Sequence, residues 1–466
     1  MDLEASRASG AVATSAPAFN AGDLFWNTKG SDYSWTSSFN LNFNPASSIN
    51  NHLLTFEVPR LASPNCAFLG DAVLQMQLIL EDKDGLQPKP EIRIAPINLF
   101  TSGMFRSVRV FLNEVEVSSS EMGAYFLRCY MSELTGLDSS SKVGHAQTYG
   151  WYRDFGGEFQ NPSATNPGFF SRMLLFGKQE AGGNITYKKD PTTCYTRLWT
   201  DFSSCSLPIV PDVGIRLELV LQDPAFYLHT SDKNAAKMGY RLKISAATLI
   251  LPVKTLATGL ALDLEKKLAE KPITYPLGRV ESKMISIPAS LQNFSTDKLT
   301  QSSLNPDRVA VILIAAQVWN PNYLTNPLEF SSRFRSPGMT QADLIRAALT
   351  VNGQPVDQEP CNGNEQLAAC AFRMLYKNLG QIDRKGDCAI SLNEFNEGYF
   401  FLLYDLTASG RAANSGAKQP ARVGNLRLDL HFSAPLPFSI NCFITAEYGS
   451  SIMIDKNRSV KYNFIA

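Results

Sequence analysis

The run DRKGDCAISLNEF, residues 383–395, is the part of this sequence whose residue types and spacing most suggest chemistry. Acidic side chains stand at its first, fifth and twelfth positions, as in the calcium-binding loop of an EF-hand. The third position should offer an oxygen but is Lys385, and the sixth should be glycine but is Cys388. Residues 399–404 then predict a strand where an EF-hand has its exiting helix. We therefore interpret the run as a solvated turn and predict no calcium site.

The remaining candidates for catalysis or metal binding are four histidines, His52, His145, His229 and His431. They are too far apart to form H-x-H or H-x-x-x-H, the clusters that a metal ion held by a jelly roll would need. The sequence also has no G-x-S-x-G elbow, P-loop or G-x-G-x-x-G, and it singles out no Ser-His-Asp triad, whose members meet only in space. We predict no catalytic, cofactor-binding or metal-ligating residue, no cofactor and no enzymatic activity.

Two short charge pairs, Arg216 with Glu218 and Arg427 with Asp429, alternate with leucines. Side chains two apart on a strand share a face, so each pair lies on the outward side of its strand. We expect modest ion pairs there and no catalytic role for these carboxylates.

The elements that hold these residues read as strands. Apolar and polar residues alternate with period two over 108–113, 216–222 and 426–432, and 73–80 is an apolar run of strand length. Such alternation marks half-buried strands of antiparallel sheets. Many strands separated by Gly, Pro and Asn predict an all-β chain of sandwich or jelly-roll type, with short covering helices.

The strand pattern occurs twice in the same order, which indicates an internal duplication. A strand, tight turn and strand at 112–117 recur at 351–356, and a helix-like run at 121–136 recurs at 365–380. Three more pairs extend the match: 213–219 with 423–430, 56–59 with 285–288, and 71–80 with 307–316. We therefore predict two tandem antiparallel eight-stranded jelly rolls.

The duplication and the local composition predict four parts. Residues 1–22, rich in Ala, Ser and Gly, form a flexible arm. The first jelly roll spans 23–257, a helical linker that ends at Pro272 spans 258–272, and the second jelly roll spans 273–466. The first half also carries a long loop, 138–192, with Gly, Asn and Pro throughout, and loops of this length are typically functional or disordered.

Composition favours a protein that associates with proteins. In 466 residues, 18% are charged, against about 25% in a typical soluble domain, and 11% are aromatic. A surface with few charges favours large protein–protein interfaces, while a high ratio of core to surface is the alternative. The 43 basic and 43 acidic residues give no net charge and no basic tail, which argues against nucleic-acid binding.

The eight cysteines lack C-x-x-C spacing and predict buried free thiols in a reducing compartment. The first residues, MDLE, have neither the basic region nor the apolar core of a signal peptide. No apolar run reaches the roughly 18 residues of a membrane span. We expect neither secretion by a signal peptide nor a transmembrane segment.

Ordered stretches across both halves resemble a known family. They are PINLF at 96–100 leading into 108–113, then 275–276 with 279–281, 403–407, 424–428, 446–448 and 454–458. In this order they resemble the double jelly-roll major capsid protein of Polinton (Maverick) elements and of adintovirus-like DNA viruses. The arm 1–22 and the loop 138–192 match nothing in that family.

The resemblance implies a structural role. It implies a homotrimer whose six jelly rolls form a hexon-like, pseudo-hexameric capsomer that tiles an icosahedral shell. Implied partners are neighbouring capsomers, a single jelly-roll penton protein and minor or cement capsid proteins, with no sequence-specific nucleic acid. The implied location is the virion capsid, assembled inside the host cell in nucleus or cytoplasm. It also places the loops 138–192 and 320–342 on the outer surface and the arm 1–22 beneath the capsomer.

Two other readings stay open at this level. One is a tandem jelly-roll hydrolase or carbohydrate-binding protein, which would want clustered acids, aromatics or metal ligands in one cleft. The other is a minor shell protein, or a domesticated copy, with the same fold.

Overall fold

The computed structural model describes most of the chain. The described residues are 34–49, 52–119, 124–232, 234–297, 299–300, 302, 304–319, 324–338, 340–356, 363–382, 388–410, 412 and 422–463. The predicted arm 1–22 lies outside them, as do residues 383–387 of the turn that resembles an EF-hand and residues 320–323 of the loop 320–342.

The elements of the first half, in chain order, are β1 (Trp35–Phe43), β2 (Leu53–Val58), β3 (Asn65–Ala67), η2 (Leu69–Asp71), β4 (Val73–Glu81), β5 (Ile94–Pro96), α3 (Phe100–Gly103), β6 (Phe105–Leu112), β7 (Val115–Ser119), α4 (Ala124–Gly136), α5 (Ser139–Val143), η3 (His145–Tyr149), α6 (Pro167–Phe176), β8 (Gly177–Gln179), β9 (Ile185–Tyr187), β10 (Thr192–Arg197), η4 (Asp201–Ser204), β11 (Ile215–Leu221), α7 (Pro224–Tyr227), β12 (Leu228–Thr230), α8 (Ala235–Met238) and β13 (Arg241–Leu256).

Helix α9 (Thr258–Glu270) follows and confirms the helix expected before Pro272. The elements of the second half are β14 (Ile273–Ile287), β15 (Asn293–Thr296), β16 (Arg308–Ala315), η5 (Ala316–Trp319), β17 (Arg333–Phe334), β18 (Ala342–Val351), β19 (Gln354–Pro355), α10 (Asn364–Asn378), α11 (Leu392–Asn396), β20 (Phe401–Asp405), β21 (Leu426–Phe432), β22 (Ile440–Ile454) and β23 (Val460–Asn463).

Two antiparallel sheets form a sandwich in the first half. One sheet has the order β1-β13-β4-β10 and the other β2-β11-β6-β7. The alternation seen in the sequence explains the packing: Leu217 and Leu219 of β11 are fully buried, while Arg216 and Glu218 face outward. Two packed antiparallel sheets of four strands each, with connections that cross between the sheets, are the arrangement of a jelly roll.

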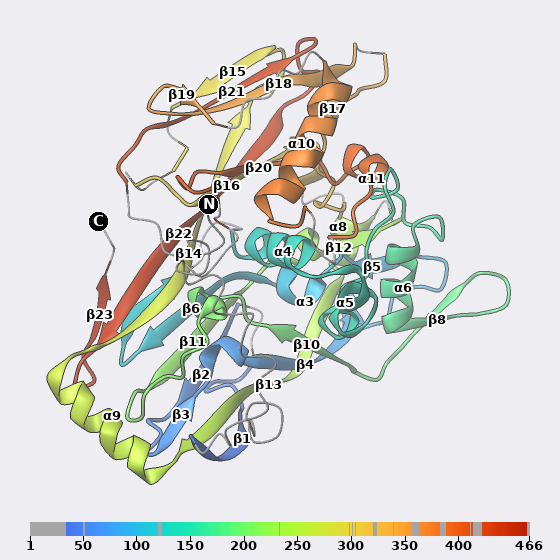
Figure 1. Ribbon diagram of the computed structural model, residues 1–466. Helices are drawn as coiled ribbons and strands as arrows, with labels where there is room; N and C mark the ends of the chain where they lie inside the picture. The colour runs from blue at the N-terminus through green and yellow to red at the C-terminus, as the bar shows by residue number, and fades with distance from the viewer. Residues whose placement is uncertain are drawn as a thin grey trace, which may run out of the picture.

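The second half repeats the strand order of these two sheets. Its sheets have the orders β14-β22-β16-β20 and β15-β21-β18, with β17 and β19 both pairing with β18. Each strand of the two first-half orders has a counterpart here, for example β13 and β22, β11 and β21, or β7 and β19, while β17 and β23 are additional strands. The fold is therefore two tandem jelly rolls with short covering helices, as predicted, and Figure 1 shows them as the lower and upper layers.

One turn is repeated in atomic detail. The β6–β7 turn has Asn113 and Glu114 at positive φ, 44° and 66°, and the β18–β19 turn has Asn352 and Gly353 at 51° and 80°. Positive φ at both central residues suits a tight hairpin and favours Asn and Gly. In each turn the Asn side chain accepts from a backbone N–H of the strand segment opposite it, Gly214 N at 2.9 Å and Asn425 N at 2.8 Å. We call this contact, which occurs once in each half, the turn clamp.

One anchor of the predicted duplication is wrong. Residues 56–58 belong to β2, which pairs with β11, whereas 285–287 belong to β14, which pairs with β22. The counterpart of β2 is β15, and the counterpart of β14 is β1. Both segments are apolar strand ends that precede a proline, and this pattern says nothing about which sheet a strand enters. The other anchors fall on equivalent elements.

The segment 138–192 is not the irregular loop that its Gly, Asn and Pro content suggested. It contains α5, η3, α6 and the β8–β9 hairpin. Helix α6 begins at Pro167, and the Asn166 side chain before it accepts from Phe169 N, which is the usual arrangement at a helix start. We call 138–191 the insertion, because the second half has no segment of this length between α10 and β20.

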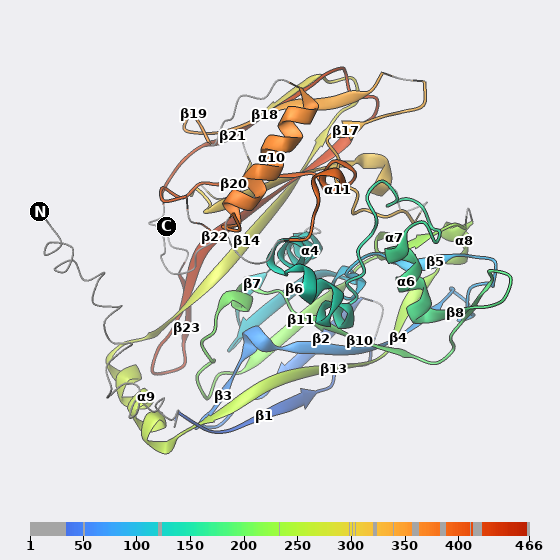
Figure 2. The ribbon, with the colours of Figure 1, turned by 45° about the vertical axis from the view of Figure 1, so that its right-hand side comes forward.

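The two jelly rolls lie side by side, with α4 and the insertion between them (Figure 2). Helix α9 lies at one end of the molecule, where β13 passes into β14, and the β8–β9 hairpin lies at the opposite end (Figures 1 and 2). The buried apolar side chains of both halves form one contiguous cluster. The halves therefore share a core, and the polar groups within that core are the natural place to look for a site.

Candidate functional site: the interface between the two jelly rolls

Asp154, in the insertion, is the centre of the buried polar contacts between the two halves. One carboxylate oxygen accepts from Arg172 Nη2 at 2.6 Å and Asn166 Nδ2 at 2.9 Å, and the other accepts from Asn326 Nδ2 at 3.1 Å. Its backbone carbonyl accepts from the Tyr399 hydroxyl at 2.7 Å. All five residues are at most 1% exposed, so a carboxylate that is costly to bury is balanced by a guanidinium and two amides.

Arg172 completes the balance from α6. Its Nε donates to the Pro96 carbonyl at 2.7 Å, and Nη1 donates to the Tyr152 carbonyl. Each of the three guanidinium nitrogens therefore donates to an acceptor, and the bond to Pro96 fixes the insertion against β5. Because two of the partners of Asp154, Asn326 and Tyr399, belong to the second half, the same cluster ties the insertion to the second jelly roll.

Arg153 continues this contact toward solvent. Its guanidinium forms a salt bridge with Glu394 in α11, donates to the Ala389 carbonyl and lies 5.1 Å from the centre of the Tyr399 ring. Burial alone would raise the pKa of Glu394, but hydrogen bonds from Ser391 and the charge of Arg153 lower it overall. The carboxylate is therefore favoured in its ionised, paired state.

Close backbone approach completes this part of the interface. Gly157 N donates to the Glu397 carbonyl at 2.7 Å, and Gly398 has φ +126°. A Cβ at Gly398 would lie 2.3 Å from the Phe159 ring, and that ring packs edge-on against Tyr399 at 5.0 Å. Only glycine allows both the backbone conformation and the contact with the insertion.

A second buried pair lies nearer the middle of the molecule. Arg128 of α4 bonds Asp201 of η4 at 2.6 Å, and its other Nη donates to the Gly278 carbonyl of β14 at 3.0 Å. Burial raises the pKa of the Asp201 carboxyl, and the charge of Arg128 opposes this shift. Beside the pair, the Tyr275 hydroxyl accepts from Val210 N and donates to the Pro208 carbonyl, each at 3.1 Å.

The third contact lies at the end that carries α9. Arg458, in the turn before β23, donates from Nε to the Pro211 carbonyl at 2.9 Å and pairs with Glu265 of α9 at 2.5 Å. Its own carbonyl accepts from Asn113 Nδ2 at 2.8 Å, so the first turn clamp also touches the second half. The three contacts run along the whole interface and hold the jelly rolls in one orientation.

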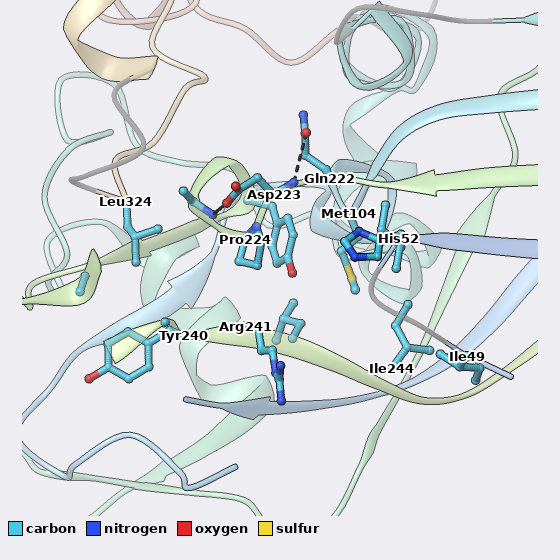
Figure 3. A pocket seen from close by; sticks show the side chains of 16 residues that line it. Ile49, His52, Met104, Gln222, Asp223, Pro224, Tyr240, Arg241, Ile244 and Leu324 are labelled. Atoms are coloured by element: carbon cyan, nitrogen blue, oxygen red, sulfur yellow. Dashed lines mark hydrogen bonds between the residues drawn. The ribbon is translucent and has the colours of Figure 1, made fainter. Parts of the chain in front are cut away.

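A pocket of about 630 Å³ opens beside β13 and α7 (Figure 3). Its polar side chains are engaged elsewhere: Asp223 caps α7 by accepting from Ala225 N, Arg241 pairs with Glu81, and the Tyr240 hydroxyl donates to Asp232. His52 and Met104 also line the pocket (Figure 3). The pocket therefore has no convergent set of acids or bases.

The histidines stay apart in the structure. Among the described residues, no group of three or more His, Cys, Asp or Glu is placed to hold a metal ion. His229 is buried against the Phe169 ring at 5.2 Å, and burial lowers its pKa to about 4, so that the ring is neutral at pH 7. The EF-hand comparison pointed to Cys388 and Glu394, and both serve the interface: the Cys388 carbonyl accepts from Lys142 Nζ, and Glu394 pairs with Arg153.

The strand charges form ion pairs, as expected from their alternation. Arg216 bonds Glu218 and also Glu114 at 2.9 Å, and Arg427 bonds Asp429 at 3.0 Å. Both pairs lie on the outward faces of β11 and β21. Water screens the exposed Arg427–Asp429 pair, so its contribution to stability is small, whereas Arg216 and Glu218 are half-buried.

Comparison with known proteins gives similarity at the level of structure only. No family model matches the chain, and no curated protein matches its sequence. A chain of the Sputnik virophage structure superposes with a TM-score of 0.67 at 12% identity, covering 94% of this chain and 90% of that one. The Faustovirus major capsid protein gives 0.57 at 9% identity, with 92% of each chain covered. The mavirus major capsid protein gives 0.55 at 12% identity, covering 94% and 92%.

The superpositions establish the fold. Sequence identities this low do not establish the activity, which has to be argued from the molecule itself. None of the helices in the described ranges is long and apolar enough to cross a membrane. With both halves matched over nearly their full length, the chain has the double jelly-roll fold of viral major capsid proteins.

Proposed function

We propose that this protein is a major capsid protein, which forms a homotrimeric, pseudo-hexameric capsomer that tiles an icosahedral virus shell. The observation that carries the proposal is the repeated strand order of the two jelly rolls, held side by side by buried polar contacts. A rigid pair of similar modules suits hexagonal tiling, because three such pairs offer six similar sides to their neighbours.

The geometry of the buried groups supports a structural role. Asp154 and Arg128 are buried and have partners from both halves, and Arg172 is buried against Asp154 and two backbone carbonyls of the first half. Such groups fix the orientation of two modules and leave nothing exposed for a substrate. A subunit that must fit a lattice needs this fixed orientation, because a change between its two halves would spread to every contact with its neighbours.

The finer assignments belong to the same proposal. The chain would consist of an arm (1–22), a first jelly roll (23–257), a helical linker (258–272) and a second jelly roll (273–466). The ordered sequence matches favour Polinton elements and adintovirus-like viruses as its relatives. Its partners would be neighbouring capsomers, a single jelly-roll penton protein and minor or cement proteins, in a virion capsid assembled inside the host cell.

Light scattering coupled to size-exclusion chromatography tests the proposal on the full chain. We expect a particle of about 150 kDa, three times the 51.4 kDa of one chain, or larger cages. Negative-stain images of the peak should show pseudo-hexagonal particles. A stable monomer, above all one that hydrolyses or binds carbohydrate, would overturn the proposal in favour of a tandem jelly-roll enzyme or lectin.

A further inference from the structure

Two equivalent edge strands differ in how they are covered. Strand β14, at the edge of its sheet in the second jelly roll, is covered by α4 and η4 of the first: Tyr275 is 1% exposed there. Its counterpart β1, at the edge of the first jelly roll, has no such cover among the described residues. Thr36 to Asn40 are all exposed, and Phe39 keeps 41% of its surface in water. An uncovered strand edge with aromatic side chains is a surface suited to association.

The covering helices differ in the complementary way. Helix α4 is buried on nearly every side, because β14 lies on its outer face. Helix α10 is its counterpart and buries only one stripe. Aligning the two stripes, Phe126, Tyr130 and Leu134 with Leu367, Ala371 and Leu375, places the buried Arg128 opposite Ala369, which is exposed. The outer face of α10 is thus the uncovered equivalent of the face of α4 that holds β14.

The edge of β1 and the outer face of α10 are equivalent to the two surfaces that meet in the α4–β14 contact, and neither has a partner of that kind among the described residues. Strand β4 aligns with β16 from residues 71 and 307 onward, and following that alignment across the ladders makes Phe39 the counterpart of Gly278. Gly278 is the residue whose carbonyl Arg128 holds. Inside the chain, the contact runs from the first jelly roll to the second. The same contact from the second jelly roll to the next chain would join α10 to β1.

We propose that the β1 edge of one chain docks on the outer face of α10 in a second copy of this chain, by the geometry that α4 and β14 use within the chain. The proposal rests on the proposed trimeric function and names the surfaces that build the trimer. Each chain carries one surface of each kind, so the contact is head-to-tail, and the three-fold rotation of the proposed trimer would close it into a ring. The occupant is argued from continuity with the α4–β14 interface, which already joins the same two types of surface.

Single substitutions test the two surfaces separately. In Phe39→Arg and Ala369→Glu, a charge is placed in the docking contact at a position that is exposed in the free chain, so the chain should still fold. Glutamate is chosen at 369 because an arginine there would reproduce Arg128, which binds the Gly278 carbonyl in the contact within the chain. We expect both variants to shift from trimer to monomer at protein concentrations where the unchanged chain is trimeric. Leu86→Arg is the matched control, because Leu86 is 63% exposed on a loop outside both surfaces, and it should remain a trimer.

Cross-linking tests the pairing directly and does not require assembly to be lost. In Asn40→Cys combined with Ala369→Cys, oxidation should give dimers and trimers on a denaturing gel, which reductant returns to monomers. Each single variant should give none. If Phe39→Arg and Ala369→Glu remain trimeric and the double cysteine variant stays monomeric, the docking proposal is overturned while the capsid proposal stands. If the unchanged chain is itself monomeric, the capsid proposal fails.

Discussion

The two jelly rolls share their strand order and their turn clamp. They differ in the segment that follows the covering helix, between α4 and β10 in the first and between α10 and β20 in the second. After α4 the first carries the insertion, and after α10 the second continues to β20 through a shorter segment, whose described residues form α11. The strands follow the same path in both, so the path depends on features that both halves retain, such as the Asn113 and Asn352 turns. The insertion is where the halves differ, and it supplies one of the three contacts that join them, the one centred on Asp154.

This difference shows how a duplicated fold can become asymmetric without losing its topology. Residues that set the strand path lie in the sheets and the turns. Among the residues that set the orientation of the halves, Asp154 and Arg172 lie in the insertion, and Asn326 and Tyr399 of the second jelly roll donate to Asp154. Loss of an insertion contact should therefore affect the whole molecule more than loss of a contact that both halves possess.

The largest expected effect is that of Asp154→Ala. The substitution leaves the Arg172 guanidinium buried without its carboxylate, and breaking a buried pair in this way costs about 3–5 kcal/mol of unfolding free energy. Guanidinium chloride denaturation at one fixed protein concentration measures it. Asp429→Ala is the matched control, since its Arg427 partner is exposed to water, and it should change the midpoint little. Equal losses of unfolding free energy in the two variants would show that the buried contact of the insertion contributes no more to stability than an exposed ion pair.

A smaller difference is expected between the two turn clamps. Asn113→Ala and Asn352→Ala each lose the bond to the backbone N–H opposite, at Gly214 or Asn425. Asn113→Ala also loses the bond to the Arg458 carbonyl, so it should cost about 1 kcal/mol more, the usual worth of one hydrogen bond. Thermal and denaturant unfolding of both variants measure the difference. A larger loss in Asn352→Ala would contradict the placement of Arg458 at the interface.

The smallest effect concerns acid. Because the pKa of Glu394 is lowered in the folded state, its pair with Arg153 contributes stability above the ordinary glutamate value of 4.5 and loses it as the pH falls through the lower folded value. The contribution is on the order of 0.5 kcal/mol, since water screens a partly exposed pair. Glu394→Gln should reduce stability at pH 7, and this deficit should shrink steadily as the pH is lowered below 4.5. A deficit that stays constant over the whole titration would show that the charge plays no part.

Much of the fold follows from local patterns. The Asn-Gly turn at 352–353, the alternating leucines of β11 and β21, and the apolar stripes of α4 and α10 each have a periodicity or a turn preference that a short stretch of chain displays. The order of these stretches predicted the duplication. It failed at 56–58 and 285–287, because an apolar strand end before proline occurs in either sheet of a sandwich.

The interface could not be predicted in the same way. Asn326 stands 172 residues and Tyr399 245 residues after Asp154 in the chain, and none of the three belongs to a local motif. One signal was available for the insertion: Asn166 followed by Pro167 is a typical helix start and could have predicted α6 within the Gly-rich and Pro-rich stretch. The partners of Arg172, by contrast, are known only once the chain is folded.

The reach of Asp154 along the chain has a consequence for synthesis. The ribosome delivers the N-terminal half first, at roughly 5–20 residues per second. Tyr399 leaves the ribosome 245 residues after Asp154, so the first half must wait, with Phe159 and its neighbours uncovered, for a partner that is not yet made. During that interval the nascent chain exposes apolar surface that can associate with other nascent chains. We therefore expect molecular chaperones to bind it before the last third of the chain is synthesised.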